Sequence, residues 1–85
     1  MIDVELLTRT GCKLCDEMKE ALTRAARDLP VALDIRLTEI DIDADEELAA
    51  NYGHDIPVLF VNGSKAFKHR ATVQDLKKRL LMADG

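Results

Sequence analysis

The sequence has no tryptophan, one tyrosine and two phenylalanines, and its 12 lysines and arginines are outnumbered by 16 acidic residues. The net charge is −4 and the pI is near 5.0. Because nucleic-acid binding needs clustered positive charge and aromatic side chains for base stacking, we expect no nucleic-acid partner. No apolar run approaches the ~18 residues of a membrane span, and the N-terminus lacks the layout of a secretory signal. We therefore expect a cytoplasmic protein without membrane association.

Cysteine and histidine are equally scarce, with two residues of each. Two cysteines exclude a secreted scaffold of several disulfides, and the histidines fit no standard zinc spacing, so we expect no zinc site. The 85 residues are 47% hydrophobic and 33% charged, which is typical of one small folded domain. We expect a single domain over residues 1–85 and a monomer.

Hydrophobic periodicity and turn-forming residues predict four strands and three helices. The strands are expected over residues 2–8, within 31–42, over 58–61 and over 65–68, and the helices from Cys12 to about Asp28, from Asp43 to Gly53, and after a Thr72 cap. The stretch 31–42 changes its apolar phase, which predicts a bulge or two buried faces. Asn62-Gly63 is typical of a tight hairpin turn, so the last two strands should pair antiparallel.

The resulting order, β-α-β-α-β-β-α, predicts an α/β fold in which helices flank a four-stranded mixed sheet. A right-handed first crossover makes the first two strands parallel. It also places the end of the first strand and the start of the first helix at a sheet edge that faces solvent. Residues 12–15, with the sequence Cys-Lys-Leu-Cys, lie at that point.

The spacing of the two cysteines points to chemistry, because two random positions would fall three apart in roughly 2% of cases. Free N–H groups and the helix dipole should lower the pKa of Cys12. The basic Arg9 and Lys13 act in the same direction, whereas Asp16 and Glu17 in the first helical turn oppose it, and we expect a lowered pKa on balance because exposed carboxylates are screened. Cys15 lies on the apolar stripe of the helix and should be buried. The pattern therefore predicts that Cys12 attacks a disulfide and that Cys15 resolves the mixed disulfide.

Three features carry a family resemblance: residues 8–15 (Thr-Arg-Thr-Gly-Cys-Lys-Leu-Cys), an Asp43 that opens a helix, and residues 52–63 (Tyr-Gly-His-Asp-Ile-Pro-Val-Leu-Phe-Val-Asn-Gly). Together they resemble the glutaredoxin-like proteins of the thioredoxin superfamily, and most closely the short bacterial ones. The resemblance covers nearly the whole chain and implies a thioredoxin-like fold and a thiol-disulfide oxidoreductase. It also implies a cis peptide bond between Ile56 and Pro57, beside the cysteine pair, where a substrate backbone would pair as an extra strand.

The resemblance further implies substrate-binding residues. Those we expect are Arg9, Gly11, Lys13, Ile56, Pro57, Arg70 and Thr72. Arg9 matches a basic residue that helps to hold glutathione in the family. The segment Lys68-His69-Arg70 stands where the family has a glycine pair, and we expect it to form an anionic-ligand subsite at the Thr72-capped helix.

The expected partner follows from that departure from the family. Without the glycine pair, close backbone approach by a tripeptide is hindered. We therefore expect a disulfide-containing protein or a low-molecular-weight thiol as partner, rather than strict dependence on glutathione. No bound cofactor is expected, and glutathione is a possible reductant.

Two other functions remain open at this stage. A Cys-x-x-Cys at the start of a helix also binds copper(I) in small metallochaperones, although those have a Met-x-Cys lead-in and close with a strand. This chain has Thr10-Gly11 before Cys12 and is expected to close with a helix. The other alternative is a redox-silent module of the same fold that binds a peptide along the Pro57 edge.

Overall fold

The structure is a computed structural model, and it describes residues 1–29 and 33–84. Its elements in chain order are β1 (Ile2–Thr8), α1 (Lys13–Asp28), β2 (Ile35–Asp41), a 3-10 turn η1 (Ile42–Ala44), α2 (Glu46–Tyr52), β3 (Val58–Val61), β4 (Ser64–Lys68) and α3 (Val73–Asp84). The predicted order is confirmed, with η1 as an additional turn. Among the helices described, none has the length and apolarity needed to cross a bilayer.

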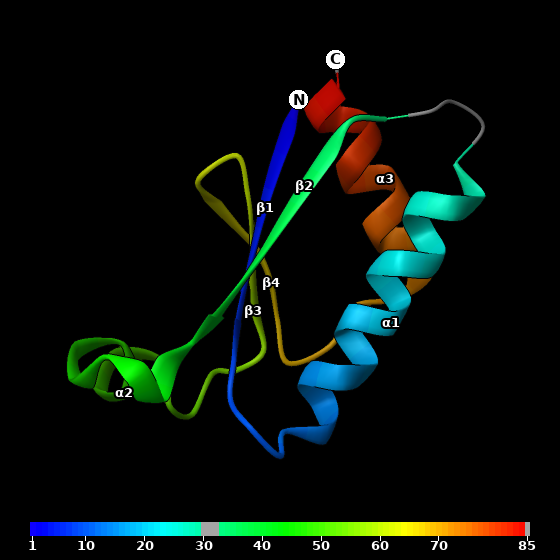
Figure 1. The fold of residues 1–85 in the computed structure, drawn as a ribbon. Helices are drawn as coiled ribbons and strands as arrows, with labels where there is room; N and C mark the ends of the chain where they lie inside the picture. Colours follow the sequence, from blue (N-terminus) through cyan, green and yellow to red (C-terminus); the bar gives the residue numbers. More distant parts are fainter. Residues whose placement is uncertain (30–32, 85) are drawn as a thin grey trace.

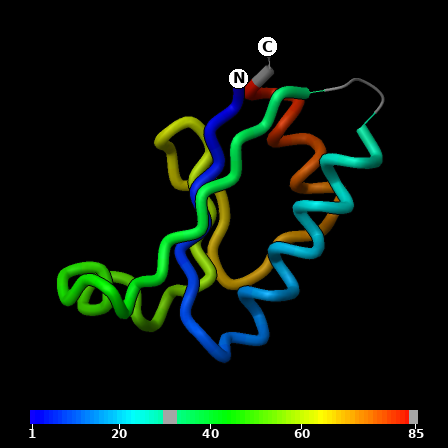
Figure 2. Tube along the Cα trace, viewed as in Figure 1, coloured from blue at the N-terminus to red at the C-terminus, as the bar shows by residue number. Residues whose placement is uncertain are grey.

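The four strands form one mixed sheet in the order β2-β1-β3-β4. β1 and β2 are parallel, as predicted, while β3 runs antiparallel to both β1 and β4. Helices α1 and α3 lie together against one face of the sheet, and α2 lies near one end of the sheet on the other side (Figure 1). The chain trace shows that the β1–α1 turn and the β4–α3 connection lie toward the same end of the molecule (Figure 2).

The main core lies between the sheet and the helix pair. The predicted apolar stripe of α1 is confirmed, since Cys15, Met18, Leu22 and Ala25 are buried. This stripe packs with side chains of β1 and with Leu76 and Leu80 of α3. The core thus fixes the start of α1 relative to the sheet and to α3.

A second, smaller cluster lies on the other face, near α2. Leu7, Ile42 and Val58 are buried there, and Tyr52 and Phe60 pack against them. The two aromatic rings meet edge to face, with centroids 6.3 Å apart, which is a favourable geometry for an aromatic pair. This cluster attaches η1 and α2 to the end of the sheet that carries the cysteines.

Two local predictions need correction. Asp43 does not open α2: it lies within η1, and Asp45 is the cap, because its carboxylate accepts from the N–H groups of Glu47 at 2.8 Å and Leu48 at 3.4 Å. The phase change in 31–42 was predicted to reflect a bulge or two buried faces, and the bulge is absent from the described part of that stretch, since the β1–β2 register runs without a shift. Residues 31–32 lie outside the described residues.

Two buried faces explain the phase change in that stretch instead. Ile35 packs against the main core, and Ile40 packs against the second cluster on the opposite face.

The turn predictions are confirmed. Asn62 and Gly63 have φ values of 50° and 83°, as a two-residue hairpin turn requires. Gly53 ends α2, and a Cβ at that position would lie 2.6 Å from the carbonyl oxygen of Ala49.

Candidate active site at the cysteine pair

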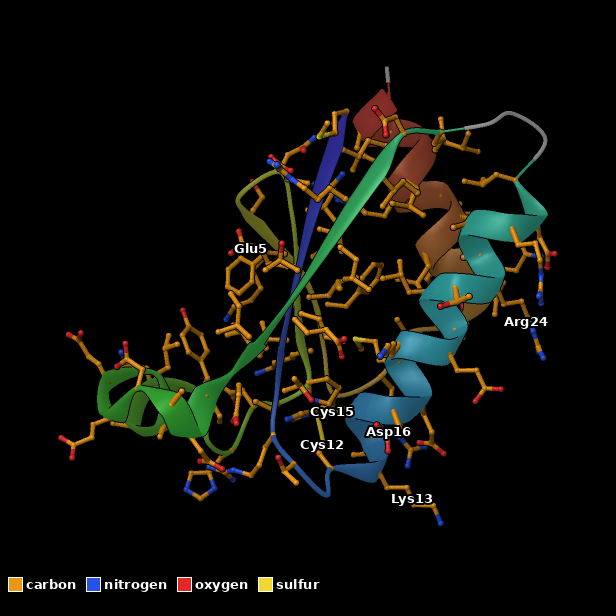
Figure 3. All side chains as sticks on the ribbon, in the orientation of Figure 1. Glu5, Cys12, Lys13, Cys15, Asp16 and Arg24 are labelled. Carbon is orange, nitrogen blue, oxygen red and sulfur yellow. A yellow bond between two sulfur atoms is a disulfide. The ribbon has the colours of Figure 1, made fainter. Side chains whose placement is uncertain are left out.

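The turn after β1 presents the first cysteine. The N–H of Cys12 donates to the carbonyl oxygen of Arg9 at 3.1 Å, and Gly11 has a φ of 81°, a conformation that side chains disfavour. Cys12 is the N-cap of α1, and its backbone is extended. Lys13, the first residue of the helix, is exposed and points away from the sheet (Figure 3). The turn therefore places the Cys12 sulfur at the start of the helix.

Cys12 and Cys15 are joined by a disulfide, with their Cα atoms 5.2 Å apart. They are unequally accessible: Cys12 is half-buried, whereas Cys15 is 1% exposed and faces the core. The backbone N–H of Cys15 donates to the sulfur of Cys12 at 3.1 Å. A donor in this position stabilises a thiolate on Cys12 when the pair is reduced, as expected at a helix N-terminus.

Arg9 forms an ion pair with Asp43 of η1. Its Nε lies 2.9 and 3.1 Å from the two carboxylate oxygens of Asp43, and its Nη2 lies 2.9 Å from one of them. These hydrogen bonds, together with the charge of Asp43, raise the pKa of Arg9. The ion pair links the turn before Cys12 to η1. The sequence predicted Arg9 as a ligand-binding residue but missed this partner, which lies 34 positions away along the chain.

The predicted cis peptide bond between Ile56 and Pro57 is confirmed. Pro57 is buried, and it directly precedes β3, in which Val58 pairs with Leu7 of β1. This register puts Pro57 at the same end of the sheet as the cysteines. The carbonyl oxygen of Pro57 accepts the backbone N–H of His69 at 2.8 Å, so the connection before α3 borders the proline. Ile56 packs against the second cluster.

A groove of about 350 Å³ lies between the first turns of α1 and α3. Its lining residues are Leu14, Glu17, Met18, His69, Arg70, Ala71, Thr72 and Asp75. Two of the seven predicted substrate-binding residues, Arg70 and Thr72, line this groove. The other five lie outside its lining: Arg9, Gly11, Lys13, Ile56 and Pro57. Leu14 and Met18 were not predicted from the sequence as lining residues. Their spacing of four, which puts both on one helix face, is the signal that could have found them.

Two of the three basic residues expected in the anionic-ligand subsite border the groove. His69 and Arg70 line the groove, but the Nζ of Lys68 lies 4.0 Å from a carboxylate oxygen of Asp55. Thr72 has the predicted capping role, because its Oγ1 accepts the backbone N–H of Asp75 at 3.1 Å. With acidic residues also in its lining, the groove offers charges of both signs to a ligand.

The fold and the disulfide together define a glutaredoxin-like protein of the thioredoxin superfamily. The chain matches the glutaredoxin-like domain family (DUF836) over residues 3–81, and it belongs to that family. It is 31% identical over 71 residues to the glutaredoxin-like protein YDR286C homolog of Dictyostelium discoideum, and 33% identical over 63 residues to an uncharacterized protein of Mycobacterium tuberculosis. These matches cover 81% and 71% of this chain, but 66% and 63% of the length of the two relatives.

Solved structures support the same fold. The X-ray structure of protein XcR50 from X. campestris has a TM-score of 0.74 and 28% identity, covering 93% of this chain and 96% of that one. Oxidized mitochondrial thioredoxin 3 from Saccharomyces cerevisiae has a TM-score of 0.57 and 20% identity, covering 99% of this chain and 78% of that one. The thioredoxin fold implied by the sequence resemblance is therefore confirmed.

Proposed function

We propose that this protein is a thiol-disulfide oxidoreductase in which Cys12 is the nucleophile and Cys15 the resolving thiol. The observation that supports it most is the unequal placement of the two sulfurs, one half-buried at a helix N-cap and the other 1% exposed. An incoming disulfide can approach Cys12, whereas Cys15 is within reach of Cys12 alone. This asymmetry suits a sequence of attack and resolution.

The reaction proceeds in two exchanges. In the first, the Cys12 thiolate attacks one substrate sulfur, a Cys12–substrate disulfide forms, and the other substrate sulfur leaves as a thiolate that solvent protonates. In the second, Cys15 loses its proton to solvent and attacks the Cys12 sulfur, which releases the second substrate thiol and closes the Cys12–Cys15 disulfide. Two electrons pass to the substrate, and a low-molecular-weight thiol or a reductase returns them by the reverse exchange.

Trapping the mixed disulfide tests this mechanism. The Cys15→Ser variant lacks the resolving thiol, so incubation with a disulfide substrate should leave one adduct on Cys12, visible by intact-mass spectrometry. Cys12→Ser is the matched control, because it retains only the buried thiol and should form no adduct. An adduct on neither cysteine, together with an inactive wild type, would contradict the proposal.

The groove between α1 and α3 supports a proposal about the partner class. We propose that Arg70 binds a carboxylate of a low-molecular-weight thiol or of an acidic segment in a disulfide-containing protein. Turnover should be compared in two coupled assays, one with glutathione and glutathione reductase and one with thioredoxin reductase. Arg70→Ala should raise the KM of the productive assay, whereas Lys68→Ala, which removes a charge outside the groove lining, should leave it unchanged. Equal KM values for all three proteins would mean that Arg70 is only a surface residue.

Copper(I) titration of the reduced protein distinguishes the soft-metal alternative. Stoichiometric tight binding by a protein that reduces no disulfide would favour metal binding over redox chemistry. A protein that neither binds copper nor exchanges disulfides would favour the peptide-binding module.

A further inference from the structure

His69 has an unusual backbone conformation at the border of the groove. Its φ is 66°, and the N–H of Arg70 donates to the carbonyl oxygen of Lys68 at 2.8 Å, which closes a three-residue turn centred on His69. Three-residue turns with positive φ at the centre are rare and strained. A residue other than glycine or asparagine keeps this conformation only where its surroundings impose it.

Two hydrogen bonds hold His69 in place, and both lead to the segment around Pro57. The backbone N–H of His69 donates to the carbonyl oxygen of Pro57 at 2.8 Å. The imidazole Nε2 lies 3.1 Å from the carbonyl oxygen of His54, and because a carbonyl can only accept, Nε2 carries the proton. The ring therefore spans from the end of β4 to the loop before Pro57.

This arrangement restrains one side of the groove. His69 lines the groove opposite Leu14 and Met18 of α1, and a ligand could displace its ring only by breaking the bond to His54. On the α1 side, Met18 is 2% exposed and packed in the core. A volume of about 350 Å³ is near the lower end of the range for small-molecule sites.

We propose that His69 is a specificity-determining residue whose imidazole forms a fixed wall of the groove and restricts the entry of peptide-sized thiol compounds. The inference rests on the proposed function for its consequence in catalysis, but the wall itself can be tested by binding alone. It favours small or extended disulfides over a compact tripeptide such as glutathione.

Two substitutions at position 69 distinguish the effect of the imidazole ring from the effect of the backbone strain. His69→Gly removes both, whereas His69→Ala removes the ring and keeps a Cβ in the strained conformation. Asn62→Ala is the control, because it places alanine at another non-glycine position with positive φ, in the β3–β4 turn and outside the groove lining. His69→Gly should unfold with an equilibrium constant about fivefold smaller than that of His69→Ala, since glycine tolerates the turn.

The effect of the His69 ring on binding is measured with S-methylglutathione, which cannot undergo disulfide exchange. Its affinity for the oxidised protein is obtained by NMR titration. Its affinity should rise at least about fivefold in both His69→Gly and His69→Ala, and stay at the wild-type value in Asn62→Ala. The ratio of kcat/KM for glutathione disulfide to that for hydroxyethyl disulfide should rise by a similar factor.

The outcomes separate the two proposals. If both His69 variants bind S-methylglutathione more tightly but the protein reduces neither glutathione disulfide nor hydroxyethyl disulfide, the role assigned to His69 is supported and the oxidoreductase function is rejected. Unchanged or weaker binding in both variants, tighter binding in His69→Gly alone, or no binding in any variant would each overturn the role assigned to His69.

Discussion

Replacing Leu80 with alanine should strongly destabilise this protein, whereas the same change at Leu81 should not. The two leucines are neighbours in α3, but Leu80 is 1% exposed in the main core and Leu81 is 42% exposed. Both substitutions change helix propensity by the same small amount, so their difference reports burial alone.

The expected magnitude follows from the size of the deletion. Leucine to alanine removes three carbons, worth ~2.4 kcal/mol at about 0.8 kcal/mol for each buried methylene, and the cavity that remains adds to this loss. We expect Leu80→Ala to lower the free energy of unfolding by about 3 kcal/mol and Leu81→Ala by about 0.5 kcal/mol or less. A domain of 85 residues has a total stability of roughly 4 to 13 kcal/mol, so the first change removes a large part of it.

Urea unfolding followed by far-ultraviolet circular dichroism is the suitable assay, because the sequence has no tryptophan. Oxidised and reduced protein should be measured separately, so that loss of the disulfide is not mistaken for loss of packing. In thermal unfolding followed by the same signal, the melting temperature should fall by roughly 12 to 24 °C for Leu80→Ala, at 4 to 8 °C per kcal/mol in a domain of this size. Equal destabilisation by the two substitutions would refute the placement of α3 against the sheet and α1.

Three further predictions concern the residues that shape the site. Thr72→Ala should cost about 1 kcal/mol of stability in urea unfolding by removing the α3 cap, while Thr72→Ser should be close to neutral. Gly11→Ala and Gly63→Ala should each cost about 1 kcal/mol, because φ values of 81° and 83° are strained for alanine, but only the former should slow disulfide exchange. Asp43→Asn removes the negative charge that pairs with Arg9 and should lower the pKa of Cys12, the nucleophile proposed above, measured by thiolate absorbance.

The parts of the fold that could be predicted from the sequence are those with local causes. The apolar stripe of α1 repeats every three or four residues, and burial of Cys15, Met18 and Leu22 follows from that spacing alone. The hairpin follows from Asn62-Gly63, because both residues tolerate the positive φ of the turn. These signals act over a few residues, and the packing of the whole chain agrees with them.

The start of α2 could not be predicted in this way, because the sequence offers two possible N-cap residues. Asp43 and Asp45 are both suitable caps by residue type. Burial of Ile42 in the second cluster decides between them, since η1 forms over Ile42–Ala44 and delays the helix to Glu46. Asp43 is then available to bind Arg9, a contact that depends on the folded arrangement of segments 34 positions apart.

The border of the groove shows why local rules fail at this site in particular. By residue type, His69 predicts an ordinary extended strand end. Instead, its backbone N–H and its ring donate to two carbonyl oxygens, those of Pro57 and His54, and keep it in a turn with positive φ. Alternation along a strand also limits how many of three consecutive basic side chains can face one groove, and Lys68 faces Asp55 instead. Local preference and global structure disagree at His69, and such disagreements are expected where a site needs a fixed shape more than it needs stability.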